Sequence, residues 1–270
     1  MAAMIARFRL GTAPWATLPL LLVAALALSG CQTGPAKPTA DPNRKVKITT
    51  TQEGTGDLKV QNGDSVWVMY SGRISKTGVQ FDANTDDPTN SEPFQLFMGM
   101  GMVIKGWEEG LLGAKIGEKR TLEIPWEKGY GENGSGEAIK PIDDLTFEVE
   151  VVYITRPGQD EFWDLVSETK GTGPAAKIGD QVSIHYKGTY LSGKLWDDTR
   201  ARGKTADFKL GDRTRVIPGV NAAVEGMQVG GKRTVILPPA LVFGLTGNQF
   251  ITGNQPVKME LELVSLNGRR

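Results

Sequence analysis

The stretch GWEEGLLGAKIGEKRTLEIP at residues 106–125 occurs a second time, as GVNAAVEGMQVGGKRTVILP at residues 219–238. Both copies keep the pattern Gly-x6-Gly-x3-Gly, then Lys-Arg-Thr and a final proline, with no gap between them. Upstream, NGDSVWVMYSG (62–72) matches IGDQVSIHYKG (178–188). A unit of roughly 110 residues is therefore duplicated. This is a normal domain size and too long for a solenoid repeat.

Each copy has a mostly β pattern. Runs such as KRTLEI and LTFEVEVVYI in the first copy, and KRTVIL and VKMELELVSL in the second, alternate apolar and polar residues with a period of two. VWVMY is β-rich but alternates poorly, and a short helix is expected only after VIKG and VIPG. The pattern predicts an α+β fold with two domains, each an antiparallel sheet with one short helix on its apolar face.

The composition is that of a soluble globular protein, with 39% hydrophobic and 23% charged residues. Lys and Arg number 31, and Asp and Glu also number 31, so the net charge is zero. Binding to nucleic acid through the whole surface needs an excess of basic side chains facing phosphates. We therefore expect no nucleic-acid partner.

The N-terminus has a different character. Arg7 and Arg9 precede the apolar run PLLLVAALAL (19–28), which has the length of a signal-peptide core, although the uncharged stretch could also serve as a membrane anchor. Leu28-Ser29-Gly30-Cys31 resembles the lipobox of bacterial lipoproteins and favours the signal peptide. We expect residues 1–30 to be removed, Cys31 to be lipidated, and 31–45 to form a flexible tether.

This resemblance implies a lipid-anchored protein of the bacterial cell envelope. Gln32 after the cysteine is no obvious inner-membrane retention signal, which favours the outer membrane, facing the periplasm. Cys31 is also the only cysteine, so neither an intramolecular disulfide nor thiol catalysis by the folded domains is expected.

Residues for several kinds of chemistry are missing. His185 is the single histidine, and the first copy has Met69 in its place, so we expect no catalytic triad. His and Cys spacings for a metal site and glycine motifs for a phosphate are absent, so neither a metal nor a cofactor is expected.

Aromatic side chains remain as the candidate functional residues of the first copy. They fall at or near the ends of the expected elements, and large aromatics most often form the core of a small domain. This structural interpretation stands beside a binding role for Tyr70, Phe81, Phe94, Trp107, Tyr130 and Phe147.

Five motifs of the first copy together resemble the FKBP-type peptidyl-prolyl cis–trans isomerases. The resemblance covers about residues 46–155, and its motifs are MYSG (69–72), QFDAN (80–84), PFQLFMG (93–99), VIKGWEEGL (103–111) and GYGENG (129–134). It implies a sheet half-wrapped around a short helix, with an apolar pocket that binds a proline ring above Trp107. The implied substrates are Xaa-Pro segments of unfolded or partly folded proteins, and the implied inhibitors are macrolides.

The resemblance also implies roles for single residues. The pocket would be lined by Phe81, Phe94, Val103, Trp107 and Phe147. The N–H of Ile104 and the hydroxyl of Tyr130 would hold a substrate carbonyl, Tyr70 and Asp82 would form a polar corner, and Ile139 would lie in an overhanging loop. The family often has an aromatic residue where this chain has Leu96, and the loop SGEAIKP (135–141) lacks the usual second proline.

The chemistry of such a pocket needs no nucleophile. Rotation about a peptide bond must break amide resonance, with a barrier of about 18–20 kcal/mol. A twisted amide has less charge separation than a planar one, so a dry aromatic pocket favours it, and each 1.36 kcal/mol or so gives a tenfold rate. Because prolyl isomerisation can limit folding, the expected role is to assist the folding of extracytoplasmic proteins.

The second copy, residues 166–270 after a linker at 156–165, keeps the scaffold with an altered site. Val220 stands at the Trp107 position, Ala206 is opposite Phe94, and Met259 is opposite Phe147. We expect a weak or inactive domain, and so a non-enzymatic chaperone or an envelope protein-binding lipoprotein is the alternative function. Its pocket would be formed by Tyr186, Trp196, Asp197, Phe208, Val216, Ile217, Val220 and Phe243.

Overall fold

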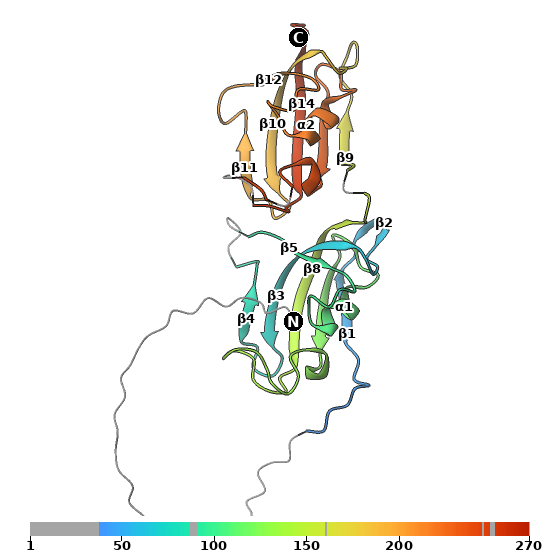
Figure 1. Cartoon of the computed structure of the whole chain (residues 1–270), viewed down its shortest axis with the longest axis vertical. Helices are drawn as coiled ribbons and strands as arrows, with labels where there is room; N and C mark the ends of the chain where they lie inside the picture. The colour runs from blue at the N-terminus through green and yellow to red at the C-terminus, as the bar shows by residue number, and fades with distance from the viewer. Residues whose placement is uncertain (1–37, 87–90, 160, 245, 249–251, 270) are drawn as a thin grey trace, which may run out of the picture. The chain divides into compact units, whose positions relative to one another are not determined.

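The computed structural model describes residues 38–86, 91–159, 161–244, 246–248 and 252–269 (Figure 1). The predicted signal peptide and the lipidated Cys31 lie outside these residues. Residues Asn43–Arg270 form one compact unit, and this unit contains both repeats. Among the described residues, no helix has the length and hydrophobicity needed to cross a membrane.

The first repeat forms a strongly bent antiparallel sheet. Its main strands lie in the order β1-β7-β8-β3-β4, and β5 pairs with the far half of β3. A small second sheet joins β2 to β6. The bounds are β1 (Lys47–Gln52), β2 (Thr55–Lys59), β3 (Ser65–Ile74), β4 (Gln80–Ala83), β5 (Phe94–Phe97), β6 (Lys115–Ile116), β7 (Lys119–Ile124) and β8 (Leu145–Thr155), with a 3-10 turn at Trp126–Lys128.

The second repeat has the same arrangement, with the order β11-β10-β14-β13-β9 and β12 paired to β10. The predicted α+β class, with one main antiparallel sheet and one short helix per repeat, is confirmed, and the small sheet of β2 and β6 is an addition in the first repeat. Strand β9 begins inside the range 156–165 that the sequence assigned to the linker. The bounds are β9 (Asp164–Thr169), β10 (Gln181–Tyr190), β11 (Leu195–Asp198), β12 (Ala206–Lys209), β13 (Lys232–Leu237) and β14 (Val257–Leu266), with a 3-10 turn at Pro239–Leu241.

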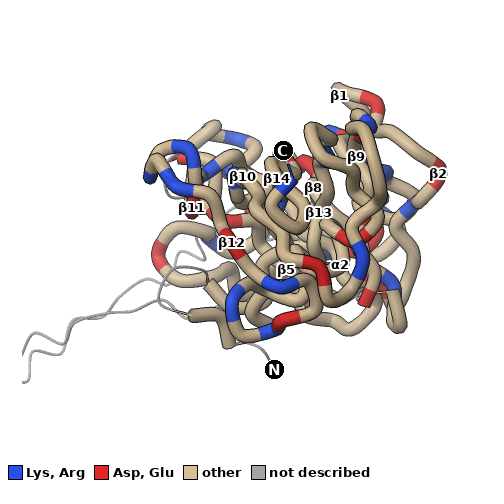
Figure 2. The backbone as a smooth tube through the Cα atoms, turned by 90° about the horizontal axis from the view of Figure 1, so that it is seen from above, with Lys and Arg blue, Asp and Glu red and all other residues tan. Residues whose placement is uncertain are grey.

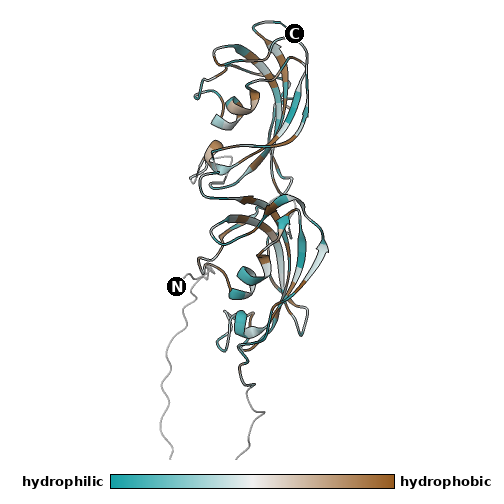
Figure 3. Ribbon diagram, turned by 90° about the vertical axis from the view of Figure 1, so that its right-hand side faces the viewer, coloured by the Kyte–Doolittle hydropathy of each residue, from teal (hydrophilic) through white to brown (hydrophobic). Residues whose placement is uncertain are grey.

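Helices α1 (Lys105–Leu111) and α2 (Pro218–Val224) each lie against one face of their sheet (Figure 3). Two glycines of α1, Gly106 and Gly110, stand one turn apart on the face turned to β7. A Cβ on Gly110 would lie 2.6 Å from a methyl carbon of Leu122, and one on Gly106 would come still closer to Ile124. The backbone of α1 therefore rests directly on the β7 side chains, and this fixes the depth at which the helix sits.

Strand β3 is buried on both faces, which explains why VWVMY alternates poorly. Val66 and Val68 are fully buried in the core under α1. Trp67 points to the other side and is nevertheless only 2% exposed. Its ring packs on that of Tyr153 from the neighbouring strand β8, with 5.5 Å between centroids.

The repeated arginine of Lys-Arg-Thr closes the C-terminal end of each helix. Arg120 Nη1 donates to the carbonyls of Gly110 and Leu112, at 2.7 and 3.0 Å. Arg233 Nη1 donates in the same way to Ala223 and Glu225. The last carbonyls of a helix have no partner within the helix, so these bonds satisfy them and tie the helix to the sheet.

Candidate functional site

The site of the first domain is built around Trp107, in the first turn of α1. Three rings meet its indole edge-on: Tyr70 from β3, Phe147 from β8 and Phe94 from β5. The centroid distances are 5.1, 5.2 and 6.2 Å, with interplanar angles of 81°, 89° and 84°. Edge-to-face geometry is the favourable one for aromatic pairs. With Phe81, these residues form the aromatic cluster.

Phe81 reaches the cluster because Gly72 leaves room for it. In the sheet, Gly72 lies between Asp82 of β4 and Phe147 of β8. A Cβ on Gly72 would lie 2.6 Å from the Phe147 ring and 2.8 Å from the Phe81 ring. These two rings meet edge-on above the glycine, 5.5 Å apart at 86°. Gly72 is the last residue of the motif MYSG, and no role was predicted for it from the sequence.

The cluster has a buried base and a partly exposed edge. Trp107 and Phe147 are 4% exposed and Tyr70 is 6% exposed. Ile139, predicted to overhang the site, is buried against the same core, in a loop held by a bridge between Ser135 and itself. The partly buried residues packed on this core include Phe81, Phe94, Val103, Ile104 and Tyr130. Nine of the ten residues predicted for the first domain therefore belong to this hydrophobic core or pack on it, and the tenth, Asp82, stands in the polar corner.

The polar corner has two hydroxyls and one carboxyl. Tyr70 donates to Asp82 Oδ2 at 2.7 Å. Burial, and then the hydrogen bond and charge of Asp82, raise the pKa of Tyr70 far above its ordinary value. Burial and the charge of Asp82 also raise the pKa of Tyr130. Both hydroxyls therefore stay protonated and remain hydrogen-bond donors at neutral pH.

Asn84, the last residue of QFDAN, holds this corner in place and was not predicted. Its Oδ1 accepts from the N–H of Tyr70 at 2.6 Å, and its Nδ2 donates to the carbonyls of Val68 and Glu92, both at 3.0 Å. An asparagine side chain can mimic a peptide group in this way. Its place two residues after the site residue Asp82 was the one available signal.

The second domain repeats this brace with a threonine. Thr199 Oγ1 accepts from the N–H of Tyr186 at 2.8 Å and donates to the Tyr186 carbonyl at 3.1 Å. His185 is half-buried, and its Nδ1 lies 3.1 Å from Thr199 Oγ1. The histidine therefore contacts the brace of the polar corner.

The site of the second domain has the predicted replacements. Trp196 lies over Gly188 as Phe81 lies over Gly72, so it takes the place of that phenylalanine. Its ring is tilted by 32° against Tyr186, at 6.2 Å. Val220 is 2% exposed and takes the floor position. By strand register, Ala206 takes the place of Phe94, and Met259 takes the place of Phe147. Phe208 is buried, and Val216, Ile217 and Phe243 are partly buried around this core.

The polar corner of the second domain also contains an arginine. Tyr186 donates to Asp197, and Arg202 Nη1 pairs with the same carboxylate at 3.0 Å. Arg202 Nη2 also donates to the Tyr186 hydroxyl at 3.2 Å. Burial and the hydrogen bond to Asp197 raise the pKa of Tyr186, against the effect of Arg202.

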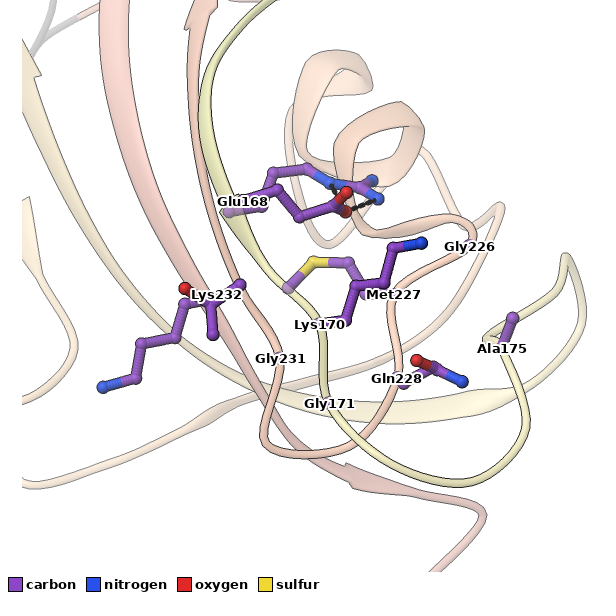
Figure 4. Close-up of a pocket in the computed structure, with 11 residues that line it drawn as sticks. Glu168, Lys170, Gly171, Ala175, Gly226, Met227, Gln228, Gly231 and Lys232 are labelled. Atoms are coloured by element: carbon purple, nitrogen blue, oxygen red, sulfur yellow. Dashed lines mark hydrogen bonds and ion pairs between the residues drawn. The ribbon is translucent and has the colours of Figure 1, made fainter.

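Two hollows of the second domain lie elsewhere. One, of about 270 Å³, lies between β9 and β13 beside the Glu168–Arg233 ion pair (Figure 4). It is lined by backbone and by chains such as Lys170 and Gln228, with no aromatic ring. The other is an open groove of about 580 Å³ that includes His185, Arg200 and Glu262. Apart from Tyr186 in the groove, neither contains a predicted site residue.

Comparison with known proteins identifies the family of both repeats. The sequence profile of the FKBP-type peptidyl-prolyl cis-trans isomerases matches residues 56–152 and 173–264. FKBP10 of Bos taurus and of Homo sapiens are each 30% identical over 227 residues, which is 83% of this chain and 38% of theirs. FK506-binding protein 2 of Kluyveromyces lactis is 43% identical over 104 residues, 38% of this chain and 72% of that protein.

Among solved structures, the three FKBP domains of wheat FKBP73 match 82% of this chain and 94% of that chain, at 24% identity and a TM-score of 0.37. The chain thus spans less than two fifths of the FKBP10 proteins it matches. The family profile covers most of both repeats and confirms the predicted resemblance. The chain belongs to the FKBP-type peptidyl-prolyl cis–trans isomerase family and has two domains of that family in tandem.

Proposed function

We propose that this chain is a peptidyl-prolyl cis–trans isomerase whose activity resides mainly in the first domain. The observation that carries the proposal is the indole of Trp107, met edge-on by three rings and bordered by the Tyr70–Asp82 pair. A proline ring is apolar and flat enough to pack on such a surface. The cluster offers it contact without a competing charge.

In this mechanism the cluster removes water from the X-Pro amide while the bond twists. The planar amide is the more polar state, so the apolar surroundings stabilise the twisted state relative to it. We assign the N–H of Ile104 and the hydroxyl of Tyr130 to the substrate carbonyls. The hydroxyl of Tyr130 is protonated at neutral pH, as a donor must be, and burial raises its pKa further. No bond to the protein forms or breaks.

For the second domain we propose a weaker catalytic role or none. Val220 offers far less flat surface than an indole, and Phe243 has no hydroxyl to donate. These differences favour binding of polypeptide without isomerisation. They also keep a non-enzymatic chaperone as the second candidate function of the chain.

The activity is tested by a protease-coupled isomerisation assay of the purified chain on Xaa-Pro peptides. Asp82→Ala combined with Tyr130→Phe is expected to lower kcat/KM by about tenfold or more, since the first removes the acceptor of the Tyr70 hydroxyl and the second a donor to substrate, each hydrogen bond worth about 1 kcal/mol. Asp197→Ala in the second domain shows which domain acts, and an equal loss there would contradict our assignment. A rate no higher than the uncatalysed one would favour the chaperone.

We further propose that the chain works outside the bacterial cytoplasm, held to a membrane by lipid on Cys31. The support is the order of basic residues, apolar run and Leu28-Ser29-Gly30-Cys31 in the sequence. Mass spectrometry of the protein isolated from membranes is expected to find a diacylated or triacylated cysteine at the N-terminus. An N-terminus at Met1 would contradict the anchor.

A further inference from the structure

We propose that the second domain binds acidic stretches of polypeptide through a basic rim beside its site. The basic rim consists of Arg202, Lys204, Arg213 and Arg215, all exposed. Two of these residues lie between β11 and β12, and two lie between β12 and α2. Figure 2 shows Lys and Arg segments gathered around the loop beside β11.

The first domain has the opposite charge in the same segments. Strand β12 pairs with β10 as β5 pairs with β3, so residues 199–217 are equivalent to residues 84–104. The second-domain segment has six basic and two acidic residues. The first-domain segment has three acidic residues and no basic one. The reversal is therefore a difference between two copies of one site.

The two parts of the rim are spaced for an extended chain. They flank β12, which is four residues long, and a strand rises about 3.3 Å per residue. The strand between them is therefore roughly 13 Å long, about the span of four residues of an extended peptide. Val216 and Ile217, which directly follow Arg215, are apolar and partly buried. A segment that mixes acidic and apolar residues matches both features.

Much of the rim's charge is available. Within the rim, Arg202 pairs with Asp197. In the part of the chain that the structure describes, Lys204, Arg213 and Arg215 make no ion pair within 4.0 Å. The carboxylate of Asp212, in the same loop, accepts from the N–H and the hydroxyl of Thr214.

A polypeptide fits this surface better than a membrane or a nucleic acid. The chain as a whole has no net charge, so its overall charge does not attract a large polyanion. The rim instead belongs to a domain whose site we propose to bind polypeptide. Binding would not use Trp107, so it would persist in a chain without isomerase activity.

The test is fluorescence anisotropy of the full chain with a labelled peptide of about twelve residues that alternates glutamate with leucine and glycine. Lys204→Glu, Arg213→Glu and Arg215→Glu together are expected to weaken binding at least tenfold, about 1.4 kcal/mol. Raising NaCl from about 50 to about 300 mM should weaken wild-type binding as well, because exposed charges are screened. The matched control, Lys45→Glu, Lys59→Glu and Lys76→Glu, makes the same charge change on exposed residues of the first domain and should bind like wild type.

Three results would overturn the proposal. The first is equal binding of a peptide with glutamine in place of glutamate. The second is an equal loss in the control variant. The third is rim-dependent binding to phosphatidylglycerol vesicles or single-stranded DNA that is tighter than binding to the peptide. If the charge reversal unfolds the domain, the neutral variant Lys204→Gln, Arg213→Gln and Arg215→Gln replaces it, with a several-fold loss expected.

Discussion

Replacing Trp107 with valine is expected to lower kcat/KM for Xaa-Pro peptides about 100-fold. Valine is the residue that the second domain has at this position, Val220. The change removes the flat indole surface on which we propose that the proline ring packs in the transition state. The three edge-on contacts that it also removes, each worth about 0.5–1.5 kcal/mol beyond burial, affect the stability of the fold and not the rate. A loss of about 2.7 kcal/mol in transition-state binding corresponds to that rate.

The indole of Trp107 is also part of the core, so the variant must be shown to fold. Truncating a buried tryptophan costs about 3–5 kcal/mol of stability, and circular dichroism must confirm a native state at the assay temperature. Trp163→Val is the matched control, because it removes a partly buried indole from the second domain. A folded Trp107 variant with nearly wild-type kcat/KM would show that the cluster is merely a core.

Replacing Arg120 with alanine is expected to destabilise the first domain by about 3–5 kcal/mol. Arg120 Nε donates to Glu118 Oε1 at 2.7 Å, and Glu118 is 5% exposed. Without the guanidinium, a carboxylate remains buried without its cation, and the carbonyls of Gly110 and Leu112 lose their donor. Urea unfolding of the full chain, followed by circular dichroism, measures the loss.

Arg233→Ala is the comparison within the same molecule. Arg233 makes the same bonds to the end of α2, but its acidic partner Glu168 is exposed and stays hydrated after the change. The cost should therefore be nearer 1 kcal/mol, as expected for hydrogen bonds without a buried charge. Equal losses in the two variants would show that the buried carboxylate of Glu118 does not matter.

At acidic pH, the free energies of unfolding of the wild type and of the Arg120→Ala variant should differ less than at neutral pH. Burial raises the pKa of Glu118, but the hydrogen bonds from Arg120, Lys115 and Thr50 and the charge of Arg120 outweigh this and lower it. The pKa of Glu118 is thus lower in the folded than in the unfolded chain. The stability that the ionised Glu118 contributes is present above the unfolded pKa of about 4.5 and is lost as pH falls through the folded value. A difference in unfolding free energy between wild type and variant that is the same at neutral pH and near pH 3 would contradict this account.

The repeat and the family motifs made the architecture predictable, and they pointed to ten first-domain residues that the structure brings together around one core. Contacts between distant segments were less so. Asn84, Gly72 and Arg120 matter because of what the sheet brings beside them: the carbonyl of Val68, two rings, and the end of a helix. Period and motif indicate which face a residue occupies, but they do not say which carbonyl lies opposite it.

The second domain shows the same limit. The aromatic residues that it lacks were predictable from the alignment of the two copies, because equivalent residues occupy equivalent positions in the two sheets. The charge of its rim was hidden by a composition that balances to zero over the whole chain. The pairing of β12 with β10, which matches that of β5 with β3, shows that the loops around these two strands are equivalent.

In both domains the strand that is synthesised last lies in the middle of the sheet. β8 is flanked by β7 and β3, and β14 by β13 and β10. Until those final residues leave the ribosome, the earlier strands have no central neighbour to pair with, and a seven-residue helix is too short to persist alone. Each domain therefore completes its folding only after its whole length has been translated, and such distant pairings make that folding slow.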